Sequence, residues 1–354
     1  MSVFRDNDFD SHEQVVFASD RETGLKAIIA VHDSTLGPGL GGCRMWPYKN
    51  SLEAVHDVLR LSRGMTYKSC LAGLPLGGAK AVIIGDAKKD KSPELMRAMG
   101  VAVERLSGRY ITAEDVGTNL DDMDIIAQQT RHVVGLRESK NGSGDPSPAT
   151  VFGVYQGILA SVDYKLRKNS LKGLKVAVQG LGSVGYKLCQ YLHKDGVELI
   201  VSDINPEAVA RAVQEFGAKA VEGNDIFTAD VDLFAPCALG AIINDTTIDQ
   251  LKCQIVAGAA NNQLAEAKHG EILKKKGILY APDYAINAGG VINVSFEYSH
   301  DHNANYQYDK DKAFAKIANI HETMLSIFRK ADQDNIPTNI AADRLVEEKL
   351  GRRK

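Results

Sequence analysis

Residues 174–203 contain the sequence feature that most constrains the fold of this chain. A strand pattern at 174–179 leads into Gly180-Leu181-Gly182-Ser183-Val184-Gly185, a helical pattern follows, and a second strand pattern at 197–202 ends at Asp203. A lone G-x-G-x-x-G is weak, but a strand before it, a helix after it and an acid ending the next strand form the context that dinucleotide binding requires. The segment therefore predicts a βαβ unit that binds a dinucleotide.

The same unit predicts how the cofactor is held. The backbone amides of 180–185, at the amino terminus of the helix, approach a pyrophosphate. Asp203 accepts hydrogen bonds from the adenosine ribose, and Ile204 after it offers no cation for a 2′-phosphate. We therefore expect NAD as the cofactor, in preference to NADP.

Strand and helix patterns continue to alternate as far as residue 282, which predicts a doubly wound parallel sheet. The loops after two further strand patterns should line the cofactor site, and they contain Cys237, Ala238, Asn261 and Asn262. The paired asparagines either bond a ligand or satisfy backbone groups of a turn.

The rest of the chain predicts a separate, mixed domain. Residues 1–50 indicate short strands and turns, with a buried strand at 27–31 and a flexible loop at 37–42. The breaker cluster at 141–148 predicts a domain boundary. The other elements expected are helices from Ser51 (to about 63), Ser92 and Thr150 (to about 168), a strand at 109–112, and terminal helices at about 310–332 and 339–350.

Two lysines twelve residues apart are candidate functional groups. Lys68 ends a helical pattern, whereas Lys80 follows the glycine-rich segment 75–79 and enters the apolar run 81–84. Desolvation disfavours an ammonium ion, so Lys80 can be tuned towards a base, while Lys68 can stay charged and hold a carboxylate. On spacing alone, two surface lysines flanking a turn fit equally well.

Asp115 is a candidate functional carboxylate. It lies just beyond the strand expected at 109–112, where ligand sites of α/β sheets usually lie. An aspartate that caps a turn would fit this position equally well.

Composition excludes several function classes. The 354 residues carry a net charge of −3, 44% hydrophobic and 25% charged residues, as in an ordinary soluble globular protein, with no indication of a nucleic-acid or membrane partner. The five cysteines are scattered, without C-x-x-C, so we expect reduced thiols in a cytoplasmic protein and no metal site. The acidic amino terminus does not predict a signal peptide.

Seven motifs together carry a resemblance to a known family: GLGGCRM (39–45), GMTYKSCLAGLPLGGAK (64–80), ITAEDVGT (111–118), GLGSVG (180–185), APCALGAIIN (235–244), GAANNQL (258–264) and APDYAINAGGVIN (281–293). Over nearly its whole length the chain resembles the amino-acid dehydrogenases that include glutamate, leucine, phenylalanine and valine dehydrogenases. The similarity is closest to the leucine-specific members.

This resemblance implies a reversible, NAD-dependent oxidative deamination of an L-amino acid to a 2-oxo acid and ammonia. It implies that Lys68 binds the substrate α-carboxylate, that Lys80 is the general base that activates water, and that Asp115 exchanges protons with the substrate nitrogen. Thr150 would contact the nicotinamide amide. Asn262 would position both substrate and nicotinamide.

The family fold implies two α/β domains. The first, 1–147, would be a mixed-sheet domain for substrate binding and oligomerisation, and the second, 148–332, a doubly wound Rossmann domain for NAD. The C-terminal helix, about 333–354, would return to the first domain, and the cleft between the domains would close on substrate. Family members are commonly homo-oligomers, so we expect an octamer, with a dimer as the alternative.

The substrate side chain follows from a difference within the family. In glutamate-specific relatives, a lysine before the Gly-Gly-x-Arg motif and a serine after Ala-Gly-Gly-Val hold the side-chain carboxylate. Leu40 and Val294 stand at these positions here and cannot pair a charge. The resemblance adds Gly41, Met65, Ala113 and Val291 to the substrate-binding residues. Leu40, Val291 and Val294, with Ala113 near them, should form an aliphatic wall around the substrate side chain. We therefore expect leucine, valine and isoleucine as substrates, and glutamate as a very poor one.

Three alternatives remain at this stage. A phenylalanine dehydrogenase of the same family would share every motif. A hydroxy-acid dehydrogenase could also use a lysine and an aspartate, and an inactive NAD-binding sensor could keep the fold without catalysis.

Overall fold

The computed structural model describes residues 3–298 and 305–352, and the chain divides into two compact units. Unit 1 comprises Met1–Asp145 with Val291–Asp311, and unit 2 comprises Pro146–Gly290 with Lys312–Lys354. None of the helices in the described part of the chain is both long and apolar enough to cross a membrane.

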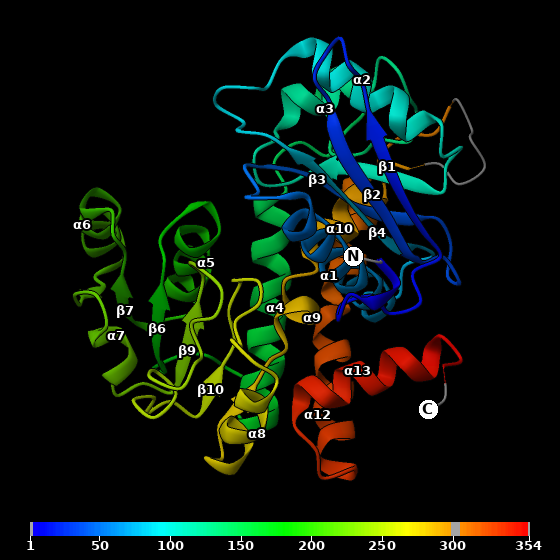
Figure 1. The fold of residues 1–354 in the computed structure, drawn as a ribbon. Coiled ribbons are helices and arrows are strands. Elements are labelled where there is room, and N and C mark those ends of the chain that lie inside the picture. Colours follow the sequence, from blue (N-terminus) through cyan, green and yellow to red (C-terminus); the bar gives the residue numbers. More distant parts are fainter. Residues whose placement is uncertain (1–2, 299–304, 353–354) are drawn as a thin grey trace. The chain divides into compact units, whose positions relative to one another are not determined.

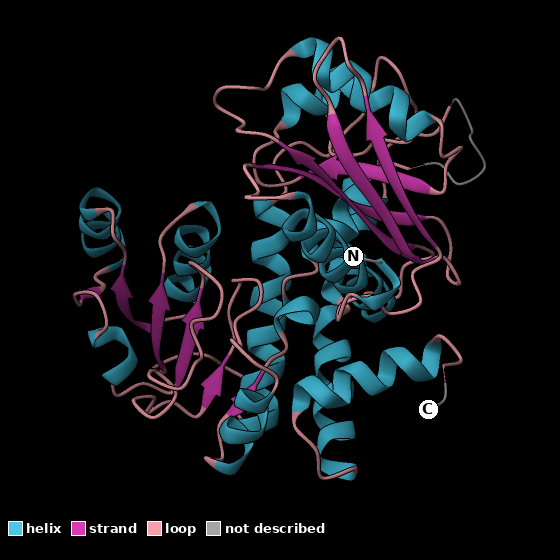
Figure 2. Ribbon diagram, viewed as in Figure 1, coloured by secondary structure: helices cyan, strands magenta, loops and turns pink. Residues whose placement is uncertain are grey.

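Unit 1 is built on a five-stranded mixed sheet (Figure 2). Its strands, in spatial order, are β1 (Gln14–Ser19), β2 (Lys26–Asp33), β4 (Gly77–Ile84), β3 (Gly39–Trp46) and β5 (Tyr110–Glu114). The β1–β2 and β2–β4 pairs are antiparallel, whereas β3 runs parallel to both β4 and β5. The expected mixed sheet is thus confirmed. The prediction of a flexible loop at 37–42 is wrong from Gly39 onward. Residues 39–42 belong to β3, which pairs with β4 on one side and with β5 on the other.

Helices cover both faces of this sheet. On one face, α1 (Ser51–Leu71) buries its apolar side chains with Ile28 and Val82. The other face packs against α2 (Pro93–Glu104) and α3 (Leu120–Ile126), which Figure 1 shows close together. Successive strand residues alternate in direction, so Lys80, two residues before Val82, faces α1. Two 3-10 turns complete the unit: Val3–Arg5 and Glu138–Lys140.

Unit 2 contains a six-stranded, entirely parallel sheet. Its strands, in spatial order, are β11 (Leu279–Tyr280), β10 (Ile255–Val256), β9 (Leu233–Pro236), β6 (Lys175–Gln179), β7 (Glu198–Ser202) and β8 (Lys219–Ala220). The strand order reverses between β6 and β9, and ligands of such sheets bind beyond the carboxyl ends of the strands at this point. The expected doubly wound sheet is confirmed.

The helices of unit 2 are α4 (Ser147–Leu166), α5 (Ser183–Lys194), α6 (Pro206–Phe216), α7 (Asp225–Thr228), α8 (Lys268–Lys275), α9 (Asp283–Ile286), α12 (Ile320–Gln333) and α13 (Thr338–Lys349). Two more, α10 (Gly289–Ser295) and α11 (Lys310–Ala318), carry the chain from one unit to the other. The single helix expected at 310–332 is two helices, α11 and α12, with Asn319 between them.

The unit boundary after Asp145 falls inside the expected cluster at 141–148. The expected return of the C-terminal helix to the first domain is wrong, because α13 packs on α12, α8 and β11, all within unit 2. The segment that belongs with residues 1–145 is instead 291–311. Hydrogen bonds hold this segment to residues 1–145, because the Glu297 carboxylate accepts from the backbone N–H groups at positions 135, 136 and 143.

Candidate active site

A lysine in the middle of β4 and an aspartate just beyond the carboxyl end of β5 meet in unit 1. Lys80 Nζ lies 2.8 Å from Asp115 Oδ2, and the Lys80 side chain is only 8% exposed. Asp115 follows β5 directly, and Gly42 of β3 lets it approach, because a Cβ on Gly42 would lie 2.8 Å from Asp115 Cβ. The structure therefore brings together two of the residues that the sequence singled out.

Arg44 is a third member of this cluster that the sequence analysis missed. Its Nε donates to the same Asp115 Oδ2 at 3.0 Å, and its terminal nitrogen donates to Asp57 Oδ2 at 2.9 Å. The Tyr48 hydroxyl also donates to Asp57, at 2.7 Å. Arg44 is two residues from Gly42 in β3 and so shares its face of the sheet, but the sequence predicts a loop at 37–42 and therefore gives no sign of this shared face.

The two cations hold Asp115 ionised. Burial raises the pKa of Asp115, but the charges of Lys80 and Arg44 outweigh it and bring the pKa below its usual value. Asp115 is therefore a carboxylate at neutral pH. Burial, with a smaller contribution from the Asp115 charge, raises the pKa of the nearby Cys43 thiol to about 12, so that this thiol is neutral.

Lys68 is placed by the packing of α1 on the sheet. A Cβ on Gly78 would lie 2.0 Å from the backbone nitrogen of Thr66, so helix and strand touch directly there. Beside this contact, Met65 Cγ lies 3.2 Å from the position of a Cβ on Gly41. Lys68 is three residues after Met65, hence on the same helix face, and is partly exposed. The predicted substrate residues Gly41 and Met65 are thus neighbours, and Lys68 lies on the same face of α1 as Met65.

The aliphatic residues expected to line the substrate site lie on three elements, β3, β5 and α10. Leu40 and Ala113 belong to the paired strands β3 and β5, while Val291 and Val294 are three residues apart on α10. Leu40 is 1% and Val294 9% exposed, whereas Ala113 and Val291 are partly exposed. No charged side chain occupies either of the two positions that distinguish glutamate-specific relatives.

The glycine turn of unit 2 fits a dinucleotide. Gly180 has φ +93°, and a Cβ on Gly185 would lie 1.9 Å from the Gly180 carbonyl oxygen, so both positions require glycine. Gly182 precedes α5, whose first turn contains Ser183 and Val184, and no side chain caps this helix. A Cβ on Gly182 would meet nothing within 4 Å. Free backbone amides beside open space are what a pyrophosphate needs.

The groups around this turn are consistent with the same ligand. Asp203 accepts hydrogen bonds from the backbone nitrogens of Leu181 and Asn205, which fixes its carboxylate beside the turn. Ile204 is fully exposed. Directly before the turn, the Gln179 Oε1 atom is buried and has no hydrogen-bond partner among the described residues.

The loop after β9 closes the other side of the turn. A Cβ on Gly180 would lie 2.8 Å from Ala238 Cβ, and one on Gly185 would lie 3.1 Å from Cys237 Cβ. Burial raises the pKa of Cys237 to about 12, so this thiol is a neutral packing group. The structure thus places Cys237 and Ala238 beside the glycine turn.

Thr150 and Asn262 lie elsewhere in unit 2. Thr150, on α4, donates to the Pro146 carbonyl oxygen at 3.1 Å, and it lies beside Gly290. The two asparagines after β10 differ in their contacts. Asn261 Oδ1 accepts a hydrogen bond from the Asn287 side chain at 2.8 Å. The Asn262 carboxamide makes no hydrogen bond within residues 3–298 and 305–352. Asn262 is exposed and therefore open to a ligand.

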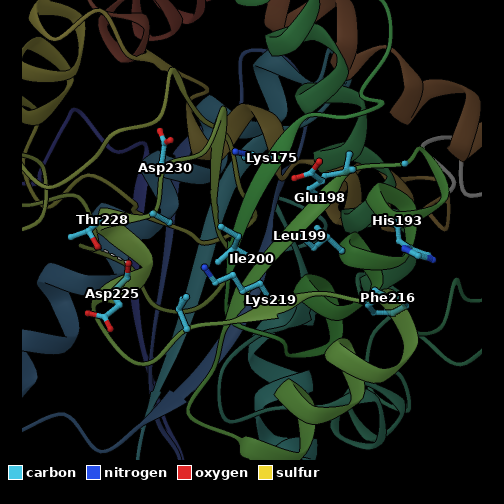
Figure 3. Close-up of a pocket in the computed structure, with 15 residues that line it drawn as sticks. Lys175, His193, Glu198, Leu199, Ile200, Phe216, Lys219, Asp225, Thr228 and Asp230 are labelled. Atoms are coloured by element: carbon cyan, nitrogen blue, oxygen red, sulfur yellow. Dashed lines mark hydrogen bonds between the residues drawn. The ribbon is translucent and has the colours of Figure 1, made fainter.

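A cavity of about 850 Å³ in unit 2 is separate from these residues (Figure 3). Its lining includes Lys175 and Glu198, the first residues of β6 and β7, so it opens near the end of the sheet opposite the glycine turn. Its ionisable groups are of both signs: Lys175, His193, Lys219, Glu198, Asp225 and Asp230. None of the predicted site residues lines it.

Two groups in the described part of the chain hold three potential metal ligands each: Asp6, Asp8 and His56, and Asp245, Glu266 and His269. In the first, His56 Nδ1 already contacts Asp8 at 2.8 Å. In the second, the Lys268 ammonium contacts both carboxylates. This ammonium group opposes the binding of a metal ion by the second group.

Comparison with known proteins decides the family. Residues 12–132 match the model of the Glu/Leu/Phe/Val dehydrogenase dimerisation domain, and residues 204–349 match that of Glutamate/Leucine/Phenylalanine/Valine dehydrogenase. The chain is 55% identical to leucine dehydrogenase from Geobacillus stearothermophilus over 351 residues, which cover 99% of this chain and 94% of the relative. The chain belongs to the Glu/Leu/Phe/Val dehydrogenase family.

Other members of this family are nearly as similar. The chain is 47% identical to phenylalanine dehydrogenase from Caldalkalibacillus thermarum, covering 100% of this chain and 95% of that one. The crystal structure of L-tryptophan dehydrogenase from Nostoc punctiforme superposes with a TM-score of 0.84 at 48% identity, covering 96% of each chain. The protein is thus an amino-acid dehydrogenase, an oxidoreductase that acts on a CH–NH₂ group with a nicotinamide cofactor. These comparisons do not select one side chain of the substrate.

Proposed function

We propose that the protein is an NAD-dependent dehydrogenase of branched-chain L-amino acids that forms 2-oxo acids and ammonia, with leucine as its best substrate. The observation that carries the chemistry is the 2.8 Å pair of Lys80 and Asp115, which lies beside Gly42 of β3 and just beyond the carboxyl end of β5. It places an ammonium group and an ionised carboxylate in direct contact, so that one group can give a proton and the other can take one.

Each residue of unit 1 has a role in this proposal. Lys68 binds the α-carboxylate of the substrate as a point charge. Asp115 exchanges protons with the substrate nitrogen, and Lys80 activates the water that attacks the imine carbon. Arg44 keeps Asp115 charged and fixes its orientation, because Arg44 Nε and Lys80 Nζ both contact the Asp115 Oδ2 atom.

Unit 2 holds the cofactor in this proposal. The chemistry that a bound nicotinamide supplies is to accept a hydride from the substrate Cα. The amides that begin α5 bind the pyrophosphate, Thr150 and Asn262 contact the nicotinamide end, and Asp203 accepts from the ribose. A carboxylate repels a 2′-phosphate, and the exposed Ile204 beside it supplies no positive charge, so NAD is preferred over NADP.

The aliphatic wall supports the choice of substrate. Leu40 and Val294 cannot pair with the side-chain carboxylate of glutamate. Burying that unpaired charge would cost roughly several kcal/mol of binding free energy. Such a wall separates leucine, isoleucine and valine by only about 1–3 kcal/mol for each methylene. Phenylalanine is the second candidate, because relatives at similar identity include enzymes named for aromatic amino acids.

One assay tests this function. The specificity constant kcat/KM is measured with the pure protein for leucine, valine, isoleucine, phenylalanine, tryptophan and glutamate, with NAD and NADP, and with 2-hydroxy acids as controls. We expect the branched aliphatic substrates with NAD to lead and glutamate to be near background. An aromatic substrate in first place overturns the leucine assignment, and glutamate in first place overturns the aliphatic-wall argument. Activity only on hydroxy acids, or on nothing, overturns the proposal as a whole.

The proposal extends to assembly and location. We propose a closed homo-oligomer, with an octamer preferred over a dimer, on the analogy with family members. All five cysteines are free thiols, as is typical of a reducing compartment, so we place the enzyme in the cytoplasm. Light scattering coupled to size exclusion measures the mass, and a monomer at assay concentration contradicts the oligomer.

A further inference from the structure

A buried carboxylate outside the catalytic pair lies against the loop that carries Asn262. Asp283, the first residue of α9, is 9% exposed. Its Oδ2 accepts a hydrogen bond from the backbone N–H of Asn262 at 2.6 Å, and its Oδ1 accepts one from the Tyr280 hydroxyl at 2.8 Å. The same carboxylate therefore joins the end of β11 to the loop after β10.

Asn262 needs such support because of its backbone. Its φ is +50°, in the left-handed region that residues with a side chain adopt at a cost. Its carbonyl oxygen accepts from the Ala241 N–H at 2.6 Å, so the residue is held on both sides. Ala241 also has a positive φ, of +56°, and Gly240 before it allows the two loops to touch.

The support continues into the body of unit 2. Tyr280 is 2% exposed, and its carbonyl oxygen accepts from the Thr338 hydroxyl of α13 at 2.7 Å. A chain of hydrogen bonds thus runs from α13 through Tyr280 and Asp283 to the backbone of Asn262. The Asn262 carboxamide itself projects from an exposed residue and is the part left for a ligand.

We propose that Asp283 is a positioning residue for the dehydrogenase reaction: by holding the Asn262 backbone in its left-handed conformation, it aims the Asn262 carboxamide at the substrate and nicotinamide. This inference rests on the proposed role of Asn262. Asp283 touches neither substrate nor cofactor. A misplacement of about 1 Å in a contact of this kind can cost about 100-fold in rate.

The test is a double-mutant cycle on the full-length enzyme, with kcat/KM for leucine as the readout. Asp283→Ala and Asn262→Ala are each expected to lower kcat/KM by about 10- to 100-fold, and the double variant is expected to be no worse than Asn262→Ala alone, within about twofold. Asp283→Asn is the rescue variant. Its amide oxygen can still accept from Asn262 while its NH₂ group donates to Tyr280, so kcat/KM should stay within about threefold of the wild type.

The matched control is Asp195→Ala. Asp195 also accepts from a tyrosine in unit 2, the Tyr155 hydroxyl at 2.6 Å, but it has no contact with the Asn262 loop. Its loss should leave kcat/KM within about twofold of the wild type. Hydrogen exchange adds a readout besides activity: Asp283→Ala should speed exchange in a peptide spanning 258–264 and leave a β6 peptide spanning 174–179 unchanged.

Each outcome has a distinct meaning. If the two substitutions are additive while Asn262→Ala is strongly impaired, or if exchange at 258–264 is unchanged, the positioning role of Asp283 is overturned and the proposed function stands. If Asn262→Ala itself retains full activity, the role of Asn262 fails and this inference fails with it. Inactivity of the wild type towards all amino acids is the separate failure of the proposed function. If Asp283→Ala is insoluble, Asp283→Ser replaces it, because the shorter side chain cannot span both partners.

Discussion

Gly78 and Thr66 touch backbone to backbone. A Cβ on Gly78 would lie 2.0 Å from the Thr66 nitrogen and 2.2 Å from its hydroxyl oxygen, and that hydroxyl is 2.8 Å from Nδ1 of the buried His32 on β2. The contact therefore fixes the distance between α1, which carries Lys68, and β4, which carries Lys80. The separation of the two lysines in space depends on a residue that has no side chain.

Gly78→Ala is expected to destabilise the protein by about 1–3 kcal/mol, because α1 must move off the sheet to admit the methyl group. It should also raise KM for leucine, since Lys68 moves with the helix. The control is Gly64→Ala in the same helix, where a Cβ meets nothing within 4 Å and alanine should stabilise by about 0.5–1 kcal/mol. Thermal unfolding and steady-state kinetics of both variants test this, and an unchanged melting temperature for Gly78→Ala would contradict it.

The two lysines should separate binding from chemistry. Lys80→Ala removes the proposed base, so kcat should fall by at least about 100-fold while NADH binding stays nearly intact. Lys68→Ala removes the α-carboxylate contact, so KM for leucine should rise about tenfold or more with a smaller change in kcat. Near-wild-type turnover of Lys80→Ala at saturating leucine would show that the roles are wrongly assigned.

Arg44 should control the acid side of the pH profile. Arg44→Gln removes one of the two charges that keep the pKa of Asp115 low, so Asp115 will take up its proton at a higher pH. The acid limb of kcat/KM should therefore move to higher pH. The stability that this depressed pKa contributes is present above the ordinary aspartate pKa and is lost as the pH falls through the folded-state value. The Arg44→Gln variant keeps less of this stabilisation.

The control for this pH profile is Arg60→Gln. Arg60 donates to Asp57 at 2.8 Å, whereas Asp115 is paired with Lys80 and Arg44, so the acid limb should stay where it is in the wild type. Equal movement of the acid limb in both variants would mean that general surface charge, and not the Arg44–Asp115 contact, sets it.

Asp203 should determine the choice between NAD and NADP. Asp203→Asn removes the negative charge but keeps an oxygen that can accept from the Leu181 N–H, so the glycine turn is preserved. The ratio of kcat/KM for NAD to that for NADP should fall by about tenfold or more. Asp225→Asn, which neutralises a carboxylate of the separate cavity, should leave the ratio unchanged. A ratio that is near one already in the wild type would rule out this role.

Unit 2 was largely predictable because its signals are local. The glycine turn, the strands on either side and Asp203 all lie within thirty consecutive residues. The strands expected at 174–179 and 197–202 are β6 (Lys175–Gln179) and β7 (Glu198–Ser202). Only the short edge strand β8 (Lys219–Ala220) carried too few residues to show a pattern.

Unit 1 was harder to predict, since its key contacts join distant segments. The Gly39–Gly42 stretch has the composition of a loop, but β4 and β5 on its two sides make it a strand. Arg44 was missed because its partner Asp115 is 71 residues away. The resemblance to a family supplied the lysine roles that spacing alone left open, but it misplaced the segment that returns to unit 1.

The Glu297 contacts have a consequence for how the chain is made. Unit 1 lacks one of its pieces, 291–311, until the 146–290 part of unit 2 has been synthesised. At about 5–20 residues per second, the amides of Gly135, Leu136 and Ser143 wait roughly 8–30 s on the ribosome before their carboxylate acceptor emerges. Residues 146–290 can therefore begin to fold before unit 1 is complete, although unit 1 is encoded first, and unit 2 in turn receives its own last piece, 312–354, only at the end of synthesis.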